Sequence, residues 1–227
     1  MINQIIQGDC FEVLPKIGSK TIDLILTDPP YLISRKSNFK NSDNVKFNGI
    51  SIDFGEWDKE EFDIERLLTE YYRVLKPGGT LVIFYDVWKS NQIKVFAEKA
   101  GFKQPRVCQW LKTNPVPINS KLNYLSNASE FFFTFVKSKK PTFNSQYDNG
   151  VYQYPLCHGK ERTKHPTQKP LPLIKDLILK HSNEGDLVLD TFGGSGTTGV
   201  ACKILNRDFI LVEMDSEYVE ISNNRII

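Results

Sequence analysis

The sequence has only four cysteines among its 227 residues, and they are scattered without a CxxC pair. This spacing fits neither a zinc site nor a disulfide framework, so we expect no metal and a cytoplasmic, reducing location. No apolar run approaches the length of a membrane-spanning helix, and no membrane partner is expected. The first ten residues, MINQIIQGDC, also lack the basic and apolar regions of a secretory signal.

The sequence also lacks a large excess of charge of one sign, because its basic and acidic residues leave a net charge of only +2. The overall charge therefore says little about a nucleic-acid partner. Hydrophobic residues make up 40% of the chain and charged residues 25%, which is typical of a globular protein. The length is sufficient for one well-packed domain, which we predict over residues 1–227.

Short apolar runs alternate with stretches of helical periodicity along the chain. The predicted strands are residues 22–27, 80–85, 187–190 and 209–213, with 107–111 and 131–136 as candidates for the far side of the same sheet. The predicted helices are residues 91–100, 171–181 and 197–205, and one that begins at the capping box of Asp58 and Glu61 and ends at Pro77-Gly78-Gly79. This alternation predicts an α/β fold with a mostly parallel sheet.

A glycine-rich segment, LDTFGGSGTTG at residues 189–199, follows a predicted strand and opens a predicted helix. Its last six residues match GxGxxG, a pattern whose glycines let the backbone approach a cofactor. Glu213 stands at the end of the next predicted strand, where its carboxylate can accept hydrogen bonds from both ribose hydroxyls. The motif alone leaves nicotinamide dinucleotides, S-adenosylmethionine and a purely structural turn open. No Gly-Lys-Ser/Thr follows, which excludes a P-loop.

A second motif, Thr27-Asp28-Pro29-Pro30-Tyr31, stands at the end of a predicted strand. Two prolines alone could simply end the strand. The acid before them and the aromatic residue after them, however, are residue types that suit methylation of the exocyclic amine of a base. The exocyclic amine of a base must become pyramidal and lose a proton before it attacks a methyl group. The Asp28 carboxylate and the Pro29 carbonyl can accept its two N–H groups, and prolines hold that backbone rigidly. Tyr31 offers a ring face to a base turned out of the duplex.

These motifs resemble those of the permuted β group of DNA amino-methyltransferases, in which the catalytic segment precedes the cofactor segment, as here. The resemblance covers nearly the whole chain and implies a Rossmann-like, doubly wound sheet that binds S-adenosyl-L-methionine. Further matching segments are Gly8-Asp9-Cys10, expected against the cofactor adenine, HPTQKP at 165–170, expected near its methionine, and WLKTN at 110–114, expected at the base pocket. In isolation the first could be a helix cap after an apolar strand, and the second an ordinary loop. Thr191 stands where many relatives have proline.

The resemblance implies two sets of site residues. The catalytic residues are Asp28, Pro29, Pro30 and Tyr31. The cofactor-binding residues are Asp9, Cys10, Asp28, His165, Thr167, Lys169, Asp190, Phe192, Gly194, Ser195, Gly196, Thr197, Thr198 and Glu213.

Two basic stretches with interleaved aromatics interrupt the regular pattern, at residues 32–57 and 137–164. We expect the first to be a flexible loop, and the resemblance makes the second a small target-recognition insertion. Each could also be an ordinary solvated loop, but such stretches suit phosphates and unstacked bases of double-stranded DNA. The expected DNA-binding residues are Arg35, Lys36, Lys40, Lys139, Lys140, Lys160, Arg162 and Lys164. The short recognition region and the analogy favour a homodimer, and a cognate restriction enzyme is a further candidate partner.

The predicted function is S-adenosylmethionine-dependent methylation of adenine N6 in a short DNA sequence, for restriction-modification or epigenetic marking. In the resembling family, aspartate at the first position of the catalytic motif usually accompanies adenine N6 chemistry, and serine accompanies cytosine N4. Cytosine N4 methylation is the alternative. A nicotinamide-dependent dehydrogenase would have no use for Asp-Pro-Pro-Tyr. A non-catalytic nucleic-acid-binding module would not explain the catalytic and cofactor motifs together.

Overall fold

The computed structural model of the chain describes residues 2–30, 62–115, 127–138 and 140–226. The chain forms two units, one of Met1–Pro29 with Ile64–Ile227 and one of Pro30–Asp63. Most of the second unit lies outside the described residues, together with the predicted loop 32–57 and the capping box before the first long helix. The following description concerns the first unit.

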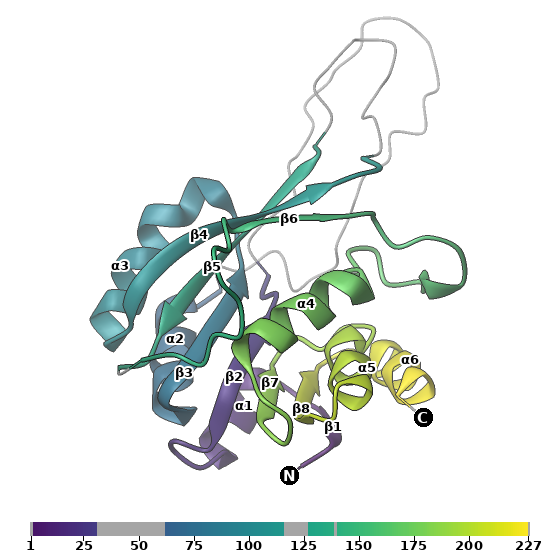
Figure 1. The fold of residues 1–227 in the computed structure, drawn as a ribbon. Coiled ribbons are helices and arrows are strands. Elements are labelled where there is room, and N and C mark those ends of the chain that lie inside the picture. Colours follow the sequence, from purple (N-terminus) through teal and green to yellow (C-terminus); the bar gives the residue numbers. More distant parts are fainter. Residues whose placement is uncertain (1, 31–61, 116–126, 139, 227) are drawn as a thin grey trace, which may run out of the picture. The chain divides into compact units, whose positions relative to one another are not determined.

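An eight-stranded sheet forms the centre of this unit, in the order β1-β8-β7-β2-β3-β5-β4-β6 (Figure 1). Only β5 runs antiparallel to its two neighbours, and the remaining strand pairs are parallel. This confirms the predicted mostly parallel α/β sheet. The strands are β1 (Gln4–Gln7), β2 (Ile22–Thr27), β3 (Leu75–Phe84), β4 (Lys103–Lys112), β5 (Ser129–Val136), β6 (Val151–Tyr154), β7 (Leu187–Asp190) and β8 (Asp208–Glu213).

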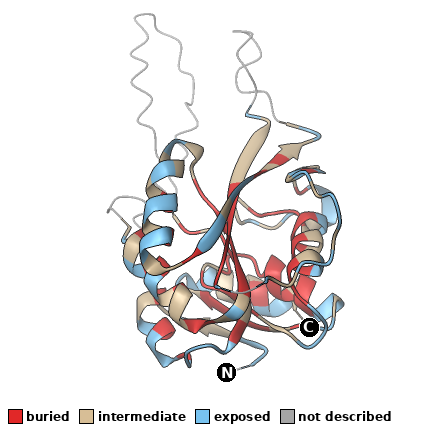
Figure 2. Ribbon diagram, turned by 60° about the vertical axis from the view of Figure 1, so that its left-hand side comes forward, coloured by how far each residue is buried: buried red, intermediate tan, exposed pale blue. Residues whose placement is uncertain are grey.

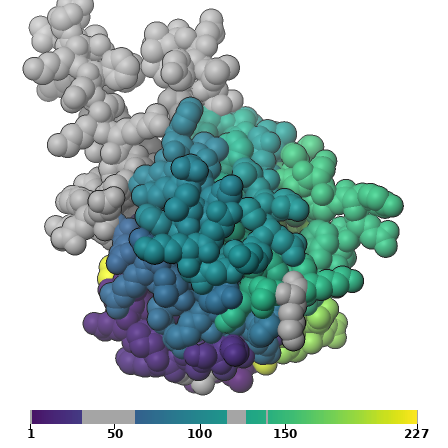
Figure 3. Space-filling model, turned by 90° about the vertical axis from the view of Figure 1, so that its left-hand side faces the viewer, coloured from purple at the N-terminus to yellow at the C-terminus, as the bar shows by residue number. Residues whose placement is uncertain are grey.

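Helices cover both faces of the sheet, as a doubly wound fold requires. One layer contains α2 and α3, and the other contains α4, α5 and α6 (Figure 1). The space-filling view from the side of α2 and α3 shows a face made largely of blue and teal residues, the colours of these helices and the strands next to them (Figure 3). The helices are α1 (Cys10–Val13), α2 (Ile64–Val74), α3 (Ser90–Ala100), α4 (Leu171–His181), α5 (Thr197–Ile204) and α6 (Ser216–Arg225), with short 3-10 turns η1 (Leu14–Lys16), η3 (Val87–Lys89) and η5 (Gly159–Glu161).

The core lies between the sheet and its two helical layers, where β2, β7, β8 and most of β3 are buried (Figure 2). The predicted apolar runs supply it, since Leu24, Leu26, Val82 and Val188 are each at most 1% exposed. Burial on both faces explains why these strands read as continuous apolar runs rather than alternating ones. None of the helices in the described part of the chain is both long and apolar enough to cross a bilayer.

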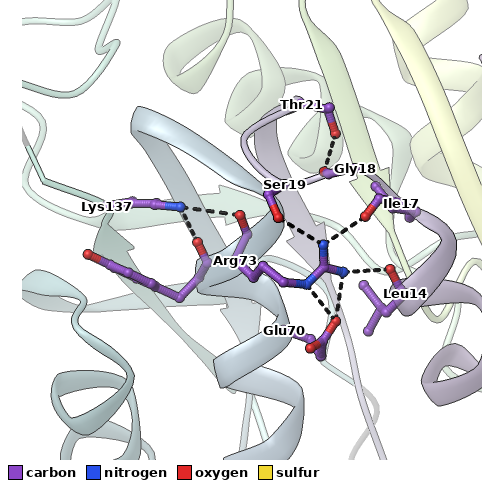
Figure 4. Close-up of polar contacts among 9 residues, drawn as sticks. Leu14, Ile17, Gly18, Ser19, Thr21, Glu70, Arg73 and Lys137 are labelled. Atoms are coloured by element: carbon purple, nitrogen blue, oxygen red, sulfur yellow. Dashed lines mark hydrogen bonds and ion pairs between the residues drawn. The ribbon is translucent and has the colours of Figure 1, made fainter.

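The helix α2 ends earlier than the sequence predicted. The carbonyls of Tyr72 and Arg73, in its last turn, accept hydrogen bonds from the buried ammonium of Lys137 (Figure 4). The same ammonium also donates to the Leu75 carbonyl at 2.8 Å. A cation at a helix C-terminus satisfies orphan carbonyls and matches the helix dipole. The chain therefore enters β3 directly, and Pro77-Gly78-Gly79 lies where the pairing register of β3 shifts rather than at a helix stop.

The side chain of Arg73 anchors the same end of α2 to the segment that leads into β2. Its guanidinium donates to the carbonyls of Leu14 and Ile17 at 2.7 and 2.8 Å and pairs with Glu70 at 2.7 Å (Figure 4). This fork of hydrogen bonds fixes the amino end of the strand whose carboxyl end carries the predicted catalytic motif.

Candidate active site

The carboxyl ends of β2 and β7 lie side by side at the topological switch point of the sheet. The two strands pair in parallel, with Leu24 opposite Val188, and the Thr27 hydroxyl donates to Asp190 Oδ1 at 3.0 Å. After β7 the chain enters the α5 layer, whereas α2 and α3 lie on the other face. Ligands of open α/β sheets bind at such a crevice. The two predicted strands that carry the motifs, residues 22–27 and 187–190, therefore end side by side.

The glycine-rich loop between β7 and α5 adopts a backbone that side chains would obstruct. Gly194 and Gly196 have φ angles of +50° and +78°. A Cβ atom on Gly194 would lie 2.9 Å from His165 Nε2, and one on Gly196 would lie 2.8 Å from Ser222 Oγ. Glycine is required at both positions because the conformation is left-handed and the space is filled. The loop is thus a tight cradle that opens α5 at Thr197.

Glu213, at the end of the neighbouring strand β8, binds the glycine-rich loop through a hydrogen bond. Its Oε2 accepts a hydrogen bond from the Gly194 amide at 2.8 Å, and its Oε1 accepts one from the Asp215 amide at 2.9 Å. Each carboxylate oxygen has a second lone pair that these bonds leave available. Burial raises the pKa of Glu213 although three backbone amides, led by that of Asp215, counteract it. The geometry suits a ribose whose hydroxyls donate to the carboxylate.

A pocket with an empty volume of about 420 Å³ lies between the two motifs. Ten of the residues predicted to bind the cofactor line it: Asp28, His165, Thr167, Lys169, Asp190, Phe192, Gly194, Ser195, Thr197 and Thr198. The sequence did not single out Leu26, Phe84 and Ile174, which add apolar walls. These three were indistinguishable from ordinary core residues because their positions follow from the packing of β2, β3 and α4.

The remaining predicted cofactor residues lie outside the pocket lining. Asp9 accepts a hydrogen bond from the Phe11 amide at 2.7 Å and so forms the N-cap of α1. The structure thus shows the helix-cap geometry that was the alternative interpretation of this segment. Cys10 is buried beside it, and burial together with Asp9 raises the pKa of its thiol to about 12. That thiol stays protonated at neutral pH.

Asp28 follows β2 directly and is the most unusual group of the pocket. Its Oδ2 forms an ion pair with the Lys169 ammonium, whereas its buried Oδ1 has no hydrogen-bond partner among the described residues. Burial raises the pKa of Asp28, and Lys169 counteracts this effect. A buried carboxylate oxygen without a partner is rare in native proteins and marks a place where a ligand N–H fits. Tyr31 lies outside the described residues.

Lys169 lies closer to Asp28, the predicted catalytic residue, than its own predicted cofactor role implies. Its ammonium reaches Asp28 on one side and Glu130 Oε2 at 3.3 Å on the other, and Glu130 Oε1 is 2.8 Å from Lys112 Nζ. Lys112 belongs to the WLKTN segment that the resemblance placed at the base pocket. No motif pointed to Glu130, and its only signal in the sequence is a charge at the head of an apolar strand.

Two further polar groups of the pocket have shifted acidities. Burial lowers the pKa of His165 to about 4, with Lys169 as the next cause, so its ring is neutral at pH 7. Its Nδ1 has no partner in the described part of the chain, and the ring packs against Tyr218 at 4.5 Å between centroids. Asp190 accepts from the Thr198 hydroxyl at 2.7 Å, and burial raises its pKa to about 6.

The structure separates the predicted DNA-binding residues into three groups. Arg35, Lys36, Lys40 and Lys139 lie outside the described residues. Lys160, Arg162 and Lys164 are exposed on the segment between β6 and α4 that leads to His165. Lys140 instead lies beside Gly78 near the start of β3, away from the carboxyl ends of the strands. The structure thus brings together with the pocket only the group at 160–164.

Comparisons with known proteins agree with this site. The chain matches the DNA methylase family, N6_N4_Mtase, over residues 22–224. It is 33% identical to the type II methyltransferase M.HinfI of Haemophilus influenzae, over 99% of this chain and 68% of that protein. It is 32% identical to M2.DpnII of Streptococcus pneumoniae, over 98% and 88%. The solved complex of M1.HpyAVI with SAM superimposes with a TM-score of 0.76 at 32% identity, covering 98% of both chains.

A more distant structure shows the same fold. The cytosine-N4-specific PvuII DNA methyltransferase matches with a TM-score of 0.75 at 21% identity, over 99% of this chain and 86% of that one.

The chain therefore belongs to the DNA methylase family. It is an S-adenosylmethionine-dependent DNA methyltransferase of the type II kind, as the resemblance implied.

Proposed function

We propose that the enzyme methylates the N6 amine of adenine, with Asp28 as the residue that receives the amine. The observation that carries this proposal is Asp28 Oδ1, a buried acceptor that lines the pocket and has no partner among the described residues. A carboxylate is a stronger acceptor for an amine N–H than a hydroxyl is. Cytosine N4 carries the same kind of amine and is the second candidate, favoured by the likeness in fold to the PvuII enzyme.

The catalytic work of the protein is mainly orientation. S-adenosylmethionine supplies an activated methyl group on a sulfonium. Asp28 Oδ1 and the carbonyl of Pro29 accept the two amine N–H groups, which turns the nitrogen lone pair out of the plane of the base. Lys169 holds Asp28 Oδ2, so that the carboxylate keeps one orientation. Such preorganised groups stabilise the developing charge without reorganising during the reaction.

The cofactor roles of the other predicted residues follow from their positions. Glu213 accepts the ribose hydroxyls, and the glycine loop with Thr197 and Thr198 lies against the rest of the molecule. His165 lines the methionine end with an unsatisfied ring nitrogen. Asp9 and Cys10 come directly after β1, whose last residue, Gln7, pairs with Glu213 of β8. This pairing brings them close to the proposed ribose acceptor.

The proposed partners are double-stranded DNA, a second copy of the chain and a restriction enzyme. Lys160, Arg162 and Lys164 contact the phosphates of double-stranded DNA, and residues 137–164 take part in target recognition, although β6 within this stretch is an integral strand of the sheet. A homodimer and a cognate restriction enzyme are proposed as further partners, by analogy with type II enzymes. The four free, buried cysteines fit a reducing cytoplasm.

Analysis of the product decides between the two bases. Plasmid DNA from a methylation-free host that expresses the chain is digested to nucleosides and examined by mass spectrometry. N6-methyladenine is expected, and N4-methylcytosine without it would overturn the base assignment. Sequencing of the modified bases in the same DNA then gives the recognised sequence.

A further inference from the structure

Four charged side chains form a row that begins at the catalytic aspartate and leads away from the cofactor cradle. Asp28 pairs with Lys169, Lys169 is 3.3 Å from Glu130, and Glu130 is 2.8 Å from Lys112. The two lysine side chains are each 9% exposed, and those of Asp28 and Glu130 are 24% and 26% exposed. Their signs alternate, so the row as a whole is neutral.

Neutrality is what allows these charges to remain in a desolvated place. An unpaired buried charge costs several kcal/mol, whereas a chain of alternating partners compensates each member. Burial alone would raise the pKa of Glu130, but Lys169 and Lys112 hold it below its ordinary value of 4.5. Glu130 is therefore an anion at neutral pH, and it provides the Lys169 ammonium with its second carboxylate.

The sheet fixes the far end of the row. Glu130 lies on β5 and is paired with Trp110 of β4, two positions before Lys112. The Lys112 ammonium lies 5.4 Å from the centre of the Trp110 ring, and the Lys169 ammonium lies 4.8 Å from that of Phe84. Both cations thus rest on aromatic faces that belong to strands. The near end of the row, in contrast, follows the last residue of β2.

We propose that Glu130 is a positioning residue for methyl transfer, acting through Lys169 with the support of Lys112. Held by Glu130, the Lys169 ammonium stays on Asp28 Oδ2, and Asp28 Oδ1 remains directed into the pocket. This inference rests on the proposed function, because it presupposes that Asp28 receives the base amine. Glu130 itself touches neither the base nor the cofactor and acts only through the lysine.

A double-mutant cycle tests the pathway. The variants are Glu130→Gln, Lys169→Met and both together, measured by single-turnover methyl transfer at saturating cofactor and DNA. We expect Glu130→Gln to slow the step about tenfold or more, as loss of one charge-assisted contact does. The double variant should be no slower than Lys169→Met alone, because Glu130 acts through the lysine. Losses that multiply in the double variant would overturn the proposal.

The dependence of the rate on pH separates positioning from simple charge. Asp28 faces Lys169 and Glu130, with Asp190 on its cofactor side, and Lys169 lowers the pKa of Asp28 while Glu130 raises it. If Glu130 acted only through its charge, Glu130→Gln would move the acidic limb of the profile to lower pH. Loss of the support for Lys169 moves it to higher pH, as in Lys169→Met, and this is the expected result. A shift to lower pH would contradict the proposal.

Two controls keep the outcome interpretable. Glu70→Gln removes a carboxylate whose ion pair with Arg73, at 2.7 Å, lies at the opposite end of β2. This variant should leave the rate of methyl transfer unchanged. Lys112→Met disturbs the row from its far end and replaces Glu130→Gln if that variant fails to fold; a wild-type rate in it would overturn the proposal. Finally, a near-normal rate of methyl transfer in Asp28→Ala would refute the proposed function. A collapsed rate in Asp28→Ala together with a wild-type rate in Glu130→Gln would refute only the positioning role of Glu130.

Discussion

The hydroxyls of Tyr71 and Thr191, which are 120 residues apart in the sequence, share a hydrogen bond beside the glycine-rich loop. Tyr71 is fully buried on α2, and Thr191 is the residue that follows β7. The Thr191 hydroxyl gives the buried tyrosine a partner. The bond therefore connects the helix layer on one face of the sheet with the glycine-rich loop after β7.

Removal of the Tyr71 hydroxyl is expected to destabilise the fold. Tyr71→Phe leaves the Thr191 hydroxyl without its partner, which should lower the free energy of unfolding by about 1–3 kcal/mol. Urea denaturation of Tyr71→Phe, Thr191→Val and the double variant measures the effect. The double variant should lose less than the sum of the single losses, because it leaves no buried group unpaired. Strictly additive losses would show that the bond contributes nothing.

Replacement of the catalytic carboxylate should abolish chemistry while the fold and the cofactor site survive. We expect Asp28→Ala to lower the single-turnover rate at least about a hundredfold, as the loss of preorganised polar groups does. Asp28→Asn keeps the shape but replaces one oxygen acceptor with a donor, and it should be equally slow. Calorimetry with S-adenosylmethionine confirms that each variant still binds its cofactor. A rate close to that of the wild type would leave the mechanism without its central residue.

Loss of the Glu213 carboxylate should weaken cofactor binding. Glu213→Ala removes the acceptors for the ribose and also frees the Gly194 amide that the carboxylate now holds at 2.8 Å. The expected loss is roughly 1.5–3 kcal/mol, measured by calorimetry. Glu217→Ala, which removes an exposed carboxylate on α6 that pairs with Lys164, is the matched control and should bind normally. Equal affinity of Glu213→Ala and the wild type would exclude Glu213 from the site.

Stability should depend on His181, the last residue of α4, in a defined pH window. Burial lowers its pKa from 6.5 to about 4, so the unfolded chain takes up the proton first as the pH falls. Its contribution is therefore complete above pH 6.5 and is lost progressively toward pH 4, by up to about 1.4 kcal/mol per pH unit. His181→Gln should lose less stability than the wild type between pH 7 and pH 4.5 in urea denaturation. Parallel curves for the two proteins would contradict the shift.

The loop before α4 should supply the salt-dependent part of DNA binding. Converting Lys160, Arg162 and Lys164 to alanine removes three exposed cations, each worth up to about 0.9 in the slope of log affinity against log salt. Fluorescence anisotropy at several salt concentrations measures this slope. Lys140→Ala is the control, because that residue lies near the start of β3, away from the carboxyl ends of the strands, and its slope should match the wild type. An unchanged slope in the triple variant would show that these side chains do not reach phosphates.

The parts of the fold that the sequence predicted are those in which local pattern and burial agree. The strands β2 and β7 are continuous apolar runs buried on both faces, and their predicted bounds match the structure. The helix α3 ends at Gly101, which adopts the left-handed conformation expected of a glycine cap. The strand β6 was missed because only Tyr152 of its four residues is buried, so it has no hydrophobic signal of its own.

Within the site, the sequence predicted residues that act through a local motif and missed those that act through tertiary contacts. Asp28 and Gly194 each stand in a recognisable motif, and the order of the two motifs along the chain is also typical of the family. Glu130 and Tyr71 reach the site only because their elements lie next to it in the sheet and its helical layer. The early end of α2 has the same origin, since the ammonium of Lys137 that binds its last carbonyls comes from beyond the end of β5. No periodicity along the chain reports such contacts.

With the cofactor and the base bound as proposed, the hydrogen bond between Thr27 and Asp190 connects the two binding sites. Asp190 also holds Thr198 at the start of α5, so a change in the cofactor cradle reaches the strand that carries Asp28 through one carboxylate. Thermodynamic reciprocity then requires a single coupling constant. Whatever factor the cofactor imposes on the affinity for DNA, DNA imposes on the affinity for the cofactor.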